Sequence, residues 1–437
     1  MNTPSHGRAS VPQPARDRLR QKALQSAHAM TDDHAKDSQD AVPTGIELTP
    51  LDESFRDDPH PVLARLRARE PVHYDQVINR WVLTRADDIE EVLRDRSMSV
   101  DPRKANEGTF MRIFERFGEF SMLFQDPPEH TRLRALVSKA FTARAVERLA
   151  PRIREIIDEL LGAVAGRDRF DVIEAFAGPL PVIVIAEMLG IDPADRQDFK
   201  RWSDAEAMSL NPLLTEDERA VADQAGEELH EYLRRVLADR RARPRDDLIS
   251  AMIGVEEAGD QLTDSEIESM CELLLAACNV TTTDLIGNGL WLLLRHPDQL
   301  QKLRNDSSLI ANAVEEMLRF ESPVVQTARI PMRDREIGGC PIRRGESVMM
   351  SLAAANRDPG RYREPGRFDV ARKEIRHQSF GGGAHFCLGA PLARLETQLA
   401  IAALLERFPR LHLADEPLEW RALPTFRGLV KLWVRVD

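Results

Sequence analysis

The spacing of apolar residues along the chain predicts mainly helices. Apolar side chains recur at every third or fourth position in residues 59–71, 145–164, 217–242 and 309–320, as in amphipathic helices. Shorter β-rich stretches occur at residues 71–84, 346–355 and 429–437. We find no repeat and no internal low-complexity linker. The pattern therefore predicts a mostly α protein with small β-sheets, folded as a single large domain over residues 45–437.

The first 44 residues differ from the rest in composition. They are polar, with recurring Pro, Ser and Gln, and contain no apolar run that could form the core of a signal peptide. Such a segment buries too little apolar surface to offset the entropy cost of ordering. We expect residues 1–44 to form a disordered N-terminal tail.

Charge and cysteine usage narrow the function classes. The 437-residue chain has a formal net charge of -12, which argues against general binding to nucleic acid or to anionic membranes. Its four cysteines include no C-x-x-C pair, so a reduced, cytoplasmic protein is expected. The most apolar stretch, residues 273–294, contains Asn279, Asp284 and Asn288, which favours a buried core helix over a membrane span.

One short segment, FGGGAHFCLG at residues 380–389, suggests chemistry. Cys387 follows three glycines and directly precedes an amphipathic helix. Helix N-terminal N–H groups favour a thiolate, and glycines allow a flat ligand to approach the backbone closely. Three interpretations follow from these residues. Cys387 is a soft metal ligand, a nucleophile with His385 as its base, or an incidental core cysteine.

The whole segment FGGGAHFCLGAPLAR resembles the haem-binding loop of bacterial, ferredoxin-dependent cytochromes P450. The resemblance extends from about Glu47 to the C-terminus. It implies the P450 fold and a haem-thiolate domain over residues 45–437. It also implies that Cys387 is the axial ligand of the iron of haem b, with Phe380 packed near the sulfur and Gly389 against the cofactor.

Further segments match the family in the expected order. Glu316-x-x-Arg319 corresponds to a structural ion pair that locks onto the segment before the haem loop, where Arg367 is the predicted third member. The resemblance assigns four basic residues to the haem propionates: His130, Arg134, Arg329 and His385.

The stretch ACNVTT, residues 277–282, matches the oxygen-activation motif of the family. Ala277 and Thr281 are four residues apart and can face the haem together. The resemblance implies that the Thr281 hydroxyl delivers protons during oxygen activation. Two positions depart from the family pattern, since Cys278 replaces a glycine and Val280 replaces an acid. Because valine cannot titrate, we predict Asp284 as the alternative proton source.

The resemblance implies a monooxygenase that activates O2 reductively and inserts one oxygen atom into a C–H bond. Electrons would come from a ferredoxin and its NAD(P)H-dependent reductase, and we expect a monomer. A basic docking face is predicted from Arg132, Lys139, Arg144 and Arg394. The alternatives are a haem-binding sensor or carrier without turnover and, further away, a haem-free cysteine hydrolase.

The substrate is expected to be a small hydrophobic compound. Apolar residues dominate the segments that line the pocket in this family, although core packing explains each of them equally well. The predicted pocket residues are Phe110, Met111, Ile113, Phe114, Phe117, Val324, Val325, Gln326, Thr425 and Phe426.

Overall fold

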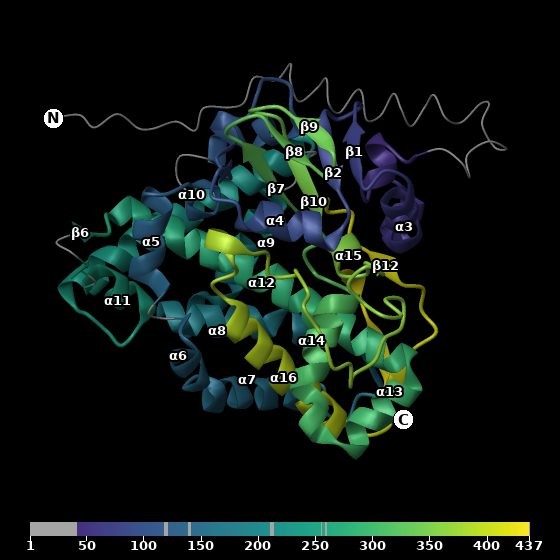
Figure 1. The fold of residues 1–437 in the computed structure, drawn as a ribbon. Coiled ribbons are helices and arrows are strands. Elements are labelled where there is room, and N and C mark those ends of the chain that lie inside the picture. The colour runs from purple at the N-terminus through teal and green to yellow at the C-terminus, as the bar shows by residue number, and fades with distance from the viewer. Residues whose placement is uncertain are drawn as a thin grey trace.

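The computed structural model describes residues 42–436, except 118–120, 139–140, 210–213, 255 and 258–259. Most of the predicted tail, and Lys139, therefore lie outside the described residues. The described chain is mostly helical with small sheets, so the predicted fold class is confirmed. The five-stranded sheet lies at the top of the view in Figure 1, and most helices lie below it.

The helices account for most of the chain. The α-helices are α2 (Glu53–Asp57), α3 (Pro59–Arg69), α4 (Ala86–Arg94), α5 (Glu129–Ser138), α6 (Ala143–Glu147), α7 (Ala150–Ala163), α8 (Pro179–Leu189), α9 (Arg196–Ser209), α10 (Glu216–Ala242), α11 (Leu248–Gly254), α12 (Asp264–Arg295), α13 (Pro297–Asn305), α14 (Ile310–Phe320), α15 (Leu352–Ala355) and α16 (Ala390–Arg407). Short 3₁₀ segments include η1 (Gly45–Leu48), η3 (Phe110–Phe117), η4 (Met122–Phe124) and η9 (Gly383–His385).

The largest sheet has the strand order β1-β2-β10-β7-β3. Strand β10 runs parallel to β2, with Val348 opposite Trp81, and antiparallel to β7, with Val348 opposite Arg329. Three of the strands come from the β-rich stretches at residues 71–84 and 346–355. The strands of this sheet are β1 (Val72–Asp75), β2 (Arg80–Leu83), β3 (Met98–Ser99), β7 (Gln326–Pro331) and β10 (Val348–Ser351).

The remaining strands form small sheets. A three-stranded sheet has the order β11-β14-β4, and three strand pairs are β12-β13, β5-β6 and β8-β9. These strands are β4 (Arg169–Asp171), β5 (Glu256–Glu257), β6 (Asp260–Gln261), β8 (Arg335–Ile337), β9 (Cys340–Ile342), β11 (His412–Leu413), β12 (Glu419–Trp420), β13 (Leu429–Lys431) and β14 (Trp433–Arg435).

Helix α12 is the longest helix of the described chain and crosses its centre (Figure 1). A capping box starts it, because Thr263 and Glu266 each accept a hydrogen bond from the other's backbone N–H. Two of its buried polar side chains donate hydrogen bonds to neighbouring segments. Asn279 donates to the Ser203 hydroxyl at 2.7 Å, and Asn288 donates to the Arg427 carbonyl at 2.8 Å. Helix α12 is thus the buried core helix that the sequence predicted.

The main apolar core surrounds α12. Leu285, Ile286 and Leu290 are almost fully buried there, together with residues of α7, α8, α14 and α16. A second cluster lies between α4 and the five-stranded sheet. Within the described residues, no helix combines the length and the apolar character needed to cross a membrane. Helices α12 and α16 pack together. This brings the loop around Cys387, residues 380–389, towards α12, and we call it the thiol loop.

Candidate active site

The loop around Cys387 requires its glycines. Gly381 and Gly383 have positive φ angles of 66° and 65°. A Cβ on Gly383 would also lie 2.1 Å from the carbonyl oxygen of Leu93, at the end of α4. The Cys387 N–H donates to the Phe380 carbonyl at 3.0 Å, which closes the loop. The glycines therefore allow the loop backbone to pack against the end of α4.

The electrostatic surroundings of Cys387 act in two directions. Burial raises the pKa of the thiol above its ordinary value. The backbone N–H groups of Gly389 and Ala390 and the guanidinium of Arg134 act in the opposite direction. The N–H contribution expected from the sequence is therefore present, but burial outweighs it. A bound cation would be needed to keep this sulfur as a thiolate.

Four basic side chains gather beside the thiol loop: His130 and Arg134 on α5, Arg329 on β7 and His385 in η9. The rings of His130 and His385 lie 3.9 Å apart between centroids. Burial, together with His130 and Arg329, lowers the pKa of His385 to about 3. Burial also lowers the pKa of Arg329 to about 10. We call these four residues the basic cluster.

Among the described residues, no side-chain carboxylate forms an ion pair or a hydrogen bond with the basic cluster. Asp126, whose oxygens accept from Ser99, Val100 and Lys104, acts on His130, Arg329 and His385 only through its charge. Both ring nitrogens of His130 are buried without a hydrogen-bond partner. The guanidinium of Arg134 donates to the Phe386 carbonyl at 2.6 Å, and that of Arg329 donates to the Ala328 carbonyl at 2.7 Å. One shared counter-charge leaves several buried cationic donors without an acceptor, and two further carboxylates would compensate them. The cluster therefore fits the two propionates of a haem whose iron Cys387 would bind.

The predicted oxygen-activation segment lies within α12. The Thr281 hydroxyl donates to the Ala277 carbonyl at 2.7 Å, so it bonds back to the preceding helical turn. The helix continues without a break from Asp264 to Arg295. Val280 is buried, with 6% of its surface exposed. The Cys278 sulfur would lie 3.7 Å from a Cβ on Gly389, so this departure from the family pattern faces the thiol loop.

Asp284 is fully buried on the same helix. Its carboxylate lies 3.2 Å from the Arg421 guanidinium, and neither oxygen has a hydrogen-bond partner within the described chain. Burial raises the pKa of Asp284 to about 7, and Arg421 acts in the opposite direction. A Cβ on Gly428 would overlap the carboxylate, at 1.9 Å from one oxygen, so the backbone there packs directly on it.

Comparisons with known proteins agree with this geometry. The family model described as cytochrome P450 matches residues 195–420. The chain is 43% identical to cytochrome P450 107B1 of Saccharopolyspora erythraea, over 89% of this chain and 98% of that protein. It is 42% identical to the cytochrome P450 monooxygenase PikC of Streptomyces venezuelae, over 90% of this chain and 95% of that protein. The chain belongs to the cytochrome P450 family.

A solved structure supports the same assignment. The bacillaene polyketide synthase cytochrome P450 PksS of Bacillus subtilis superimposes with a TM-score of 0.83 at 38% identity, covering 89% of this chain and 99% of that one. The protein is thus a haem-thiolate monooxygenase with the P450 fold. As in its relatives, the activity requires haem, a redox partner and a substrate.

The structural ion pair of this P450 is present but differs from the prediction. Arg319 donates to both Glu316 oxygens at 2.6 and 2.7 Å, and both side chains are fully buried. The third member is Arg372, whose Nε donates to the two Glu316 oxygens at 3.1 Å. The prediction of Arg367 was wrong. Its side chain is 57% exposed beside Glu364, and only its backbone carbonyl accepts from Arg319.

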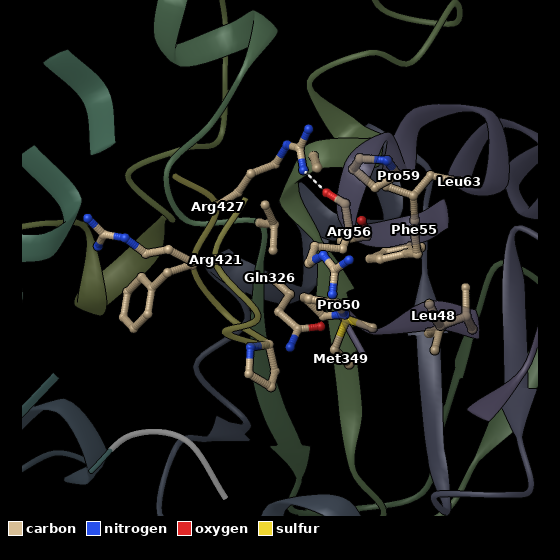
Figure 2. Close-up of a pocket in the computed structure, with 16 residues that line it drawn as sticks. Leu48, Pro50, Phe55, Arg56, Pro59, Leu63, Gln326, Met349, Arg421 and Arg427 are labelled. Carbon is tan, nitrogen blue, oxygen red and sulfur yellow. Dashed lines mark hydrogen bonds between the residues drawn. The ribbon is translucent and has the colours of Figure 1, made fainter. Parts of the chain in front are cut away.

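A cavity lies between the helices α2 and α3, the five-stranded sheet and the turn between β12 and β13 (Figure 2). We call this turn, residues 421–428, the C-terminal turn. Among the predicted pocket residues, Val325, Gln326 and Phe426 line it. Val324 pairs with Phe426 as a β-bridge, and the Val325 N–H donates to the Thr425 carbonyl at 3.0 Å. These contacts join the segment between α14 and β7 to the C-terminal turn.

The predicted aromatic lining lies elsewhere. The Phe110 ring packs on Phe114 at 5.7 Å and under the Arg80 guanidinium at 5.2 Å, and neither phenylalanine lines the cavity in the described part of the chain. Met111 is buried in a small cluster with Ile330. The roles of Phe110 and Phe114 as pocket residues remain predictions.

Sequence reasoning missed three arginines of this cavity: Arg56, Arg421 and Arg427. Arg421 lies four residues before the predicted Thr425, within WRALPTF, so its place in the C-terminal turn was the available signal. Arg56 belongs to α2, and only the fold brings that helix against the C-terminal turn.

Proposed function

We propose that this P450 binds haem b between the Cys387 loop and α12 and hydroxylates a C–H bond of a small hydrophobic substrate. The observation that carries the proposal is the basic cluster, which lies beside a glycine-held thiol and forms no hydrogen bond with a carboxylate of the described residues. In this assignment Cys387 binds the iron, and His130, Arg134, Arg329 and His385 bind the propionates. Phe380, Gly389 and Ala277 contact the macrocycle.

When bound, a thiolate-ligated haem supplies the reductive activation of O2 and the insertion of oxygen. The chain's own residues orient the substrate and supply protons. We assign proton delivery to the Thr281 hydroxyl and Asp284. Ala277, Thr281, Asp284 and Asn288 follow one another at spacings of four, three and four, so they share one face of α12. A carboxyl whose pKa is raised to about 7 is suited to donate and recover a proton near neutral pH.

Optical spectroscopy tests the haem-thiolate assignment. The purified, reduced protein should give the red-shifted carbon monoxide band of thiolate-ligated haem. Cys387→His should move the band to the position typical of histidine ligation while retaining haem. A histidine-type band in the wild-type protein would contradict the assignment of Cys387. Absence of any Soret band after reconstitution would support a haem-free protein instead.

Electron supply is proposed to come from a ferredoxin and its NAD(P)H-dependent reductase. The predicted basic docking face is supported only in part. Arg144 is exposed, whereas Arg132 pairs with Glu266, and Arg394 donates to both Glu315 oxygens at 2.6 and 2.8 Å. Phe386, beside the thiol, is 42% exposed and adds an apolar contact at the same surface. A monomer in the cytoplasm is the proposed working form, and the four free cysteines support the cytoplasmic location.

The alternative expected from the sequence, a haem-binding sensor or carrier, does not match the relatives, which are named as monooxygenases and hydroxylases. Such a protein would need the Cys387 loop and the basic cluster but neither Thr281 nor a reductase. Substrate-dependent NAD(P)H consumption with ferredoxin and reductase, accompanied by a hydroxylated product, separates the two.

A further inference from the structure

Three side chains from different segments meet beside the thiol loop: Glu315 on α14, His377 in the segment before the loop and Arg394 on α16. Arg394 donates to both Glu315 oxygens at 2.6 and 2.8 Å, and His377 Nε2 lies 3.2 Å from one of them. The Ser379 N–H donates to His377 Nδ1 at 3.2 Å, so Nε2 is the nitrogen that donates to Glu315. We call Glu315, His377 and Arg394 the Glu315 cluster.

The Glu315 cluster packs on the ring of Phe380, the first residue of the thiol loop. The guanidinium carbon of Arg394 lies 4.5 Å from the centroid of that ring, a cation–π contact. The centroid of the His377 ring lies 5.6 Å from it. The Phe380 carbonyl in turn accepts the Cys387 N–H at 3.0 Å. The ion pair and the Phe380 ring together therefore fix the Arg394 charge next to the segment that carries Cys387.

The Glu315 cluster contains one positive and one negative charge near neutral pH. Burial acts to raise the pKa of Glu315, but hydrogen bonds from Arg394 and His377 outweigh it and hold that pKa at about 2. The side chains of Glu315 and Arg394 are 28% and 31% exposed, so salt screens their charges less than those of fully exposed residues. At Cys387, burial raises the pKa of the thiol, and Arg394 is among the groups that act in the opposite direction. The Arg394 charge thus reaches the sulfur.

The two charges have opposite effects on the reduction of an iron bound by Cys387. One-electron reduction, with the electron supplied by the redox partner and no proton transferred, adds one negative charge to the site. A nearby cation favours the added charge and raises the reduction potential, whereas a nearby anion lowers it. Arg394 lies on the Phe380 ring, and Glu315 reaches the loop through Arg394 and His377. Of the two charges, the cation is therefore the one in contact with the loop.

We propose that Arg394 raises the reduction potential of the haem iron, and that Glu315 is the positioning residue that holds this guanidinium in place and offsets part of its charge. The inference rests on the proposed function, because it requires the iron on Cys387. It assigns Arg394 to the surroundings of the thiolate rather than to the predicted docking face. Arg394 already donates to both Glu315 oxygens within the molecule, so a carboxylate of a partner protein would have to displace Glu315.

Redox titration of the purified holoenzyme with dithionite, in the absence of substrate, tests the proposal. Arg394→Gln should lower the equilibrium constant for reduction by at least about threefold, which is about 28 mV at about 59 mV per tenfold for one electron. Glu315→Gln should raise this constant by about the same factor, because the Arg394 charge is then uncompensated. The double variant should lie between the two single variants. Arg407→Gln removes a positive charge from the exposed end of the same helix and, as the control, should leave the potential unchanged.

Opposite shifts separate a role of charge from a merely structural one, because a loosened thiol loop would move both variants in the same direction. Shifts of the same sign, or shifts no larger than that of Arg407→Gln, would overturn the proposal. If Arg394→Gln does not retain haem, Arg394→Lys replaces it and should keep the wild-type potential, while Glu315→Gln must still raise it. A thiolate-type carbon monoxide band without these shifts rejects only the role of the Glu315 cluster, whereas a histidine-type band rejects the proposed function itself.

Discussion

Val280 occupies the position where the family pattern has an acid, one residue before Thr281. It is buried and cannot exchange protons. The nearest carboxyl group along the same helix is Asp284, which is fully buried and has its pKa raised to about 7. At the scale of single residues, Val280 removes the titratable group of the family pattern. Asp284 provides a different titratable group, three residues after Thr281.

Val280→Asp tests whether proton supply limits turnover. If it does, the fraction of electrons that end in product should rise by at least about twofold, since general acid groups commonly contribute far more than this. Val280→Asn is the matched control, because it introduces a polar side chain of the same shape that cannot titrate. The measurement is hydroxylated product per NAD(P)H consumed. An equal effect of both variants, or none, would count against limited proton supply.

At the scale of elements, the contact between α12 and α16 contains a buried acid that the sequence did not reveal. Glu396 on α16 is 2% exposed, and its Oε2 has no hydrogen-bond partner in the described chain. Burial raises the pKa of Glu396 to about 8. Cys278 faces the same contact, and burial together with Cys387 and Glu396 raises the pKa of its thiol.

Glu396→Gln should stabilise the protein increasingly as the pH rises. In the unfolded chain the carboxyl ionises near its ordinary pKa of 4.5, whereas in the folded protein it retains its proton up to about pH 8. The stability of the wild-type protein therefore decreases as the pH rises from the pKa of the unfolded chain to that of the folded protein. The glutamine variant does not show this decrease. The Tm difference should grow by at least about 2 °C between pH 5 and pH 8. Glu406→Gln, exposed on the same helix, should show no such trend.

At the scale of the whole molecule, Glu316 and Arg319 tie α14 to a distant segment. Arg319 donates to the carbonyls of Asn356, Pro365 and Arg367 at 2.9 to 3.1 Å. Arg372 then reaches back to Glu316 and to the Arg367 carbonyl. The segment before the thiol loop is thus held mainly through its backbone.

Arg372→Ala and Arg367→Ala should therefore differ strongly. Arg372→Ala removes one of the two guanidinium groups that compensate the buried Glu316. It should lower the free energy of unfolding by about 2–3 kcal/mol. Arg367→Ala keeps the carbonyl and should change stability by less than about 0.5 kcal/mol. Denaturant unfolding followed by the Soret band and by circular dichroism measures both. Equal effects would restore Arg367 as the third member.

Much of the fold was predictable because its signals are local. The helical spacing in residues 309–320 and 217–242 led to α14 and α10, and the stretch at residues 71–84 led to the β1–β2 hairpin. The thiol loop was predictable for the same reason, since glycines, cysteine and the start of a helix are consecutive in sequence. The placement of Phe110 and Phe114 was not, because aromatic residues favour many packings equally.

The sequence by itself determined the mostly helical class, the thiol loop and the basic residues that gather beside it. Each of these follows from residue type and spacing within one segment, or from a resemblance based on such segments. Only the tertiary structure decided that Arg372, not Arg367, completes the cluster with Glu316, and that Arg421 meets Asp284. The physical reason is that long side chains bind whichever buried charge or carbonyl the chain brings back within reach, and this depends on the path of the whole backbone.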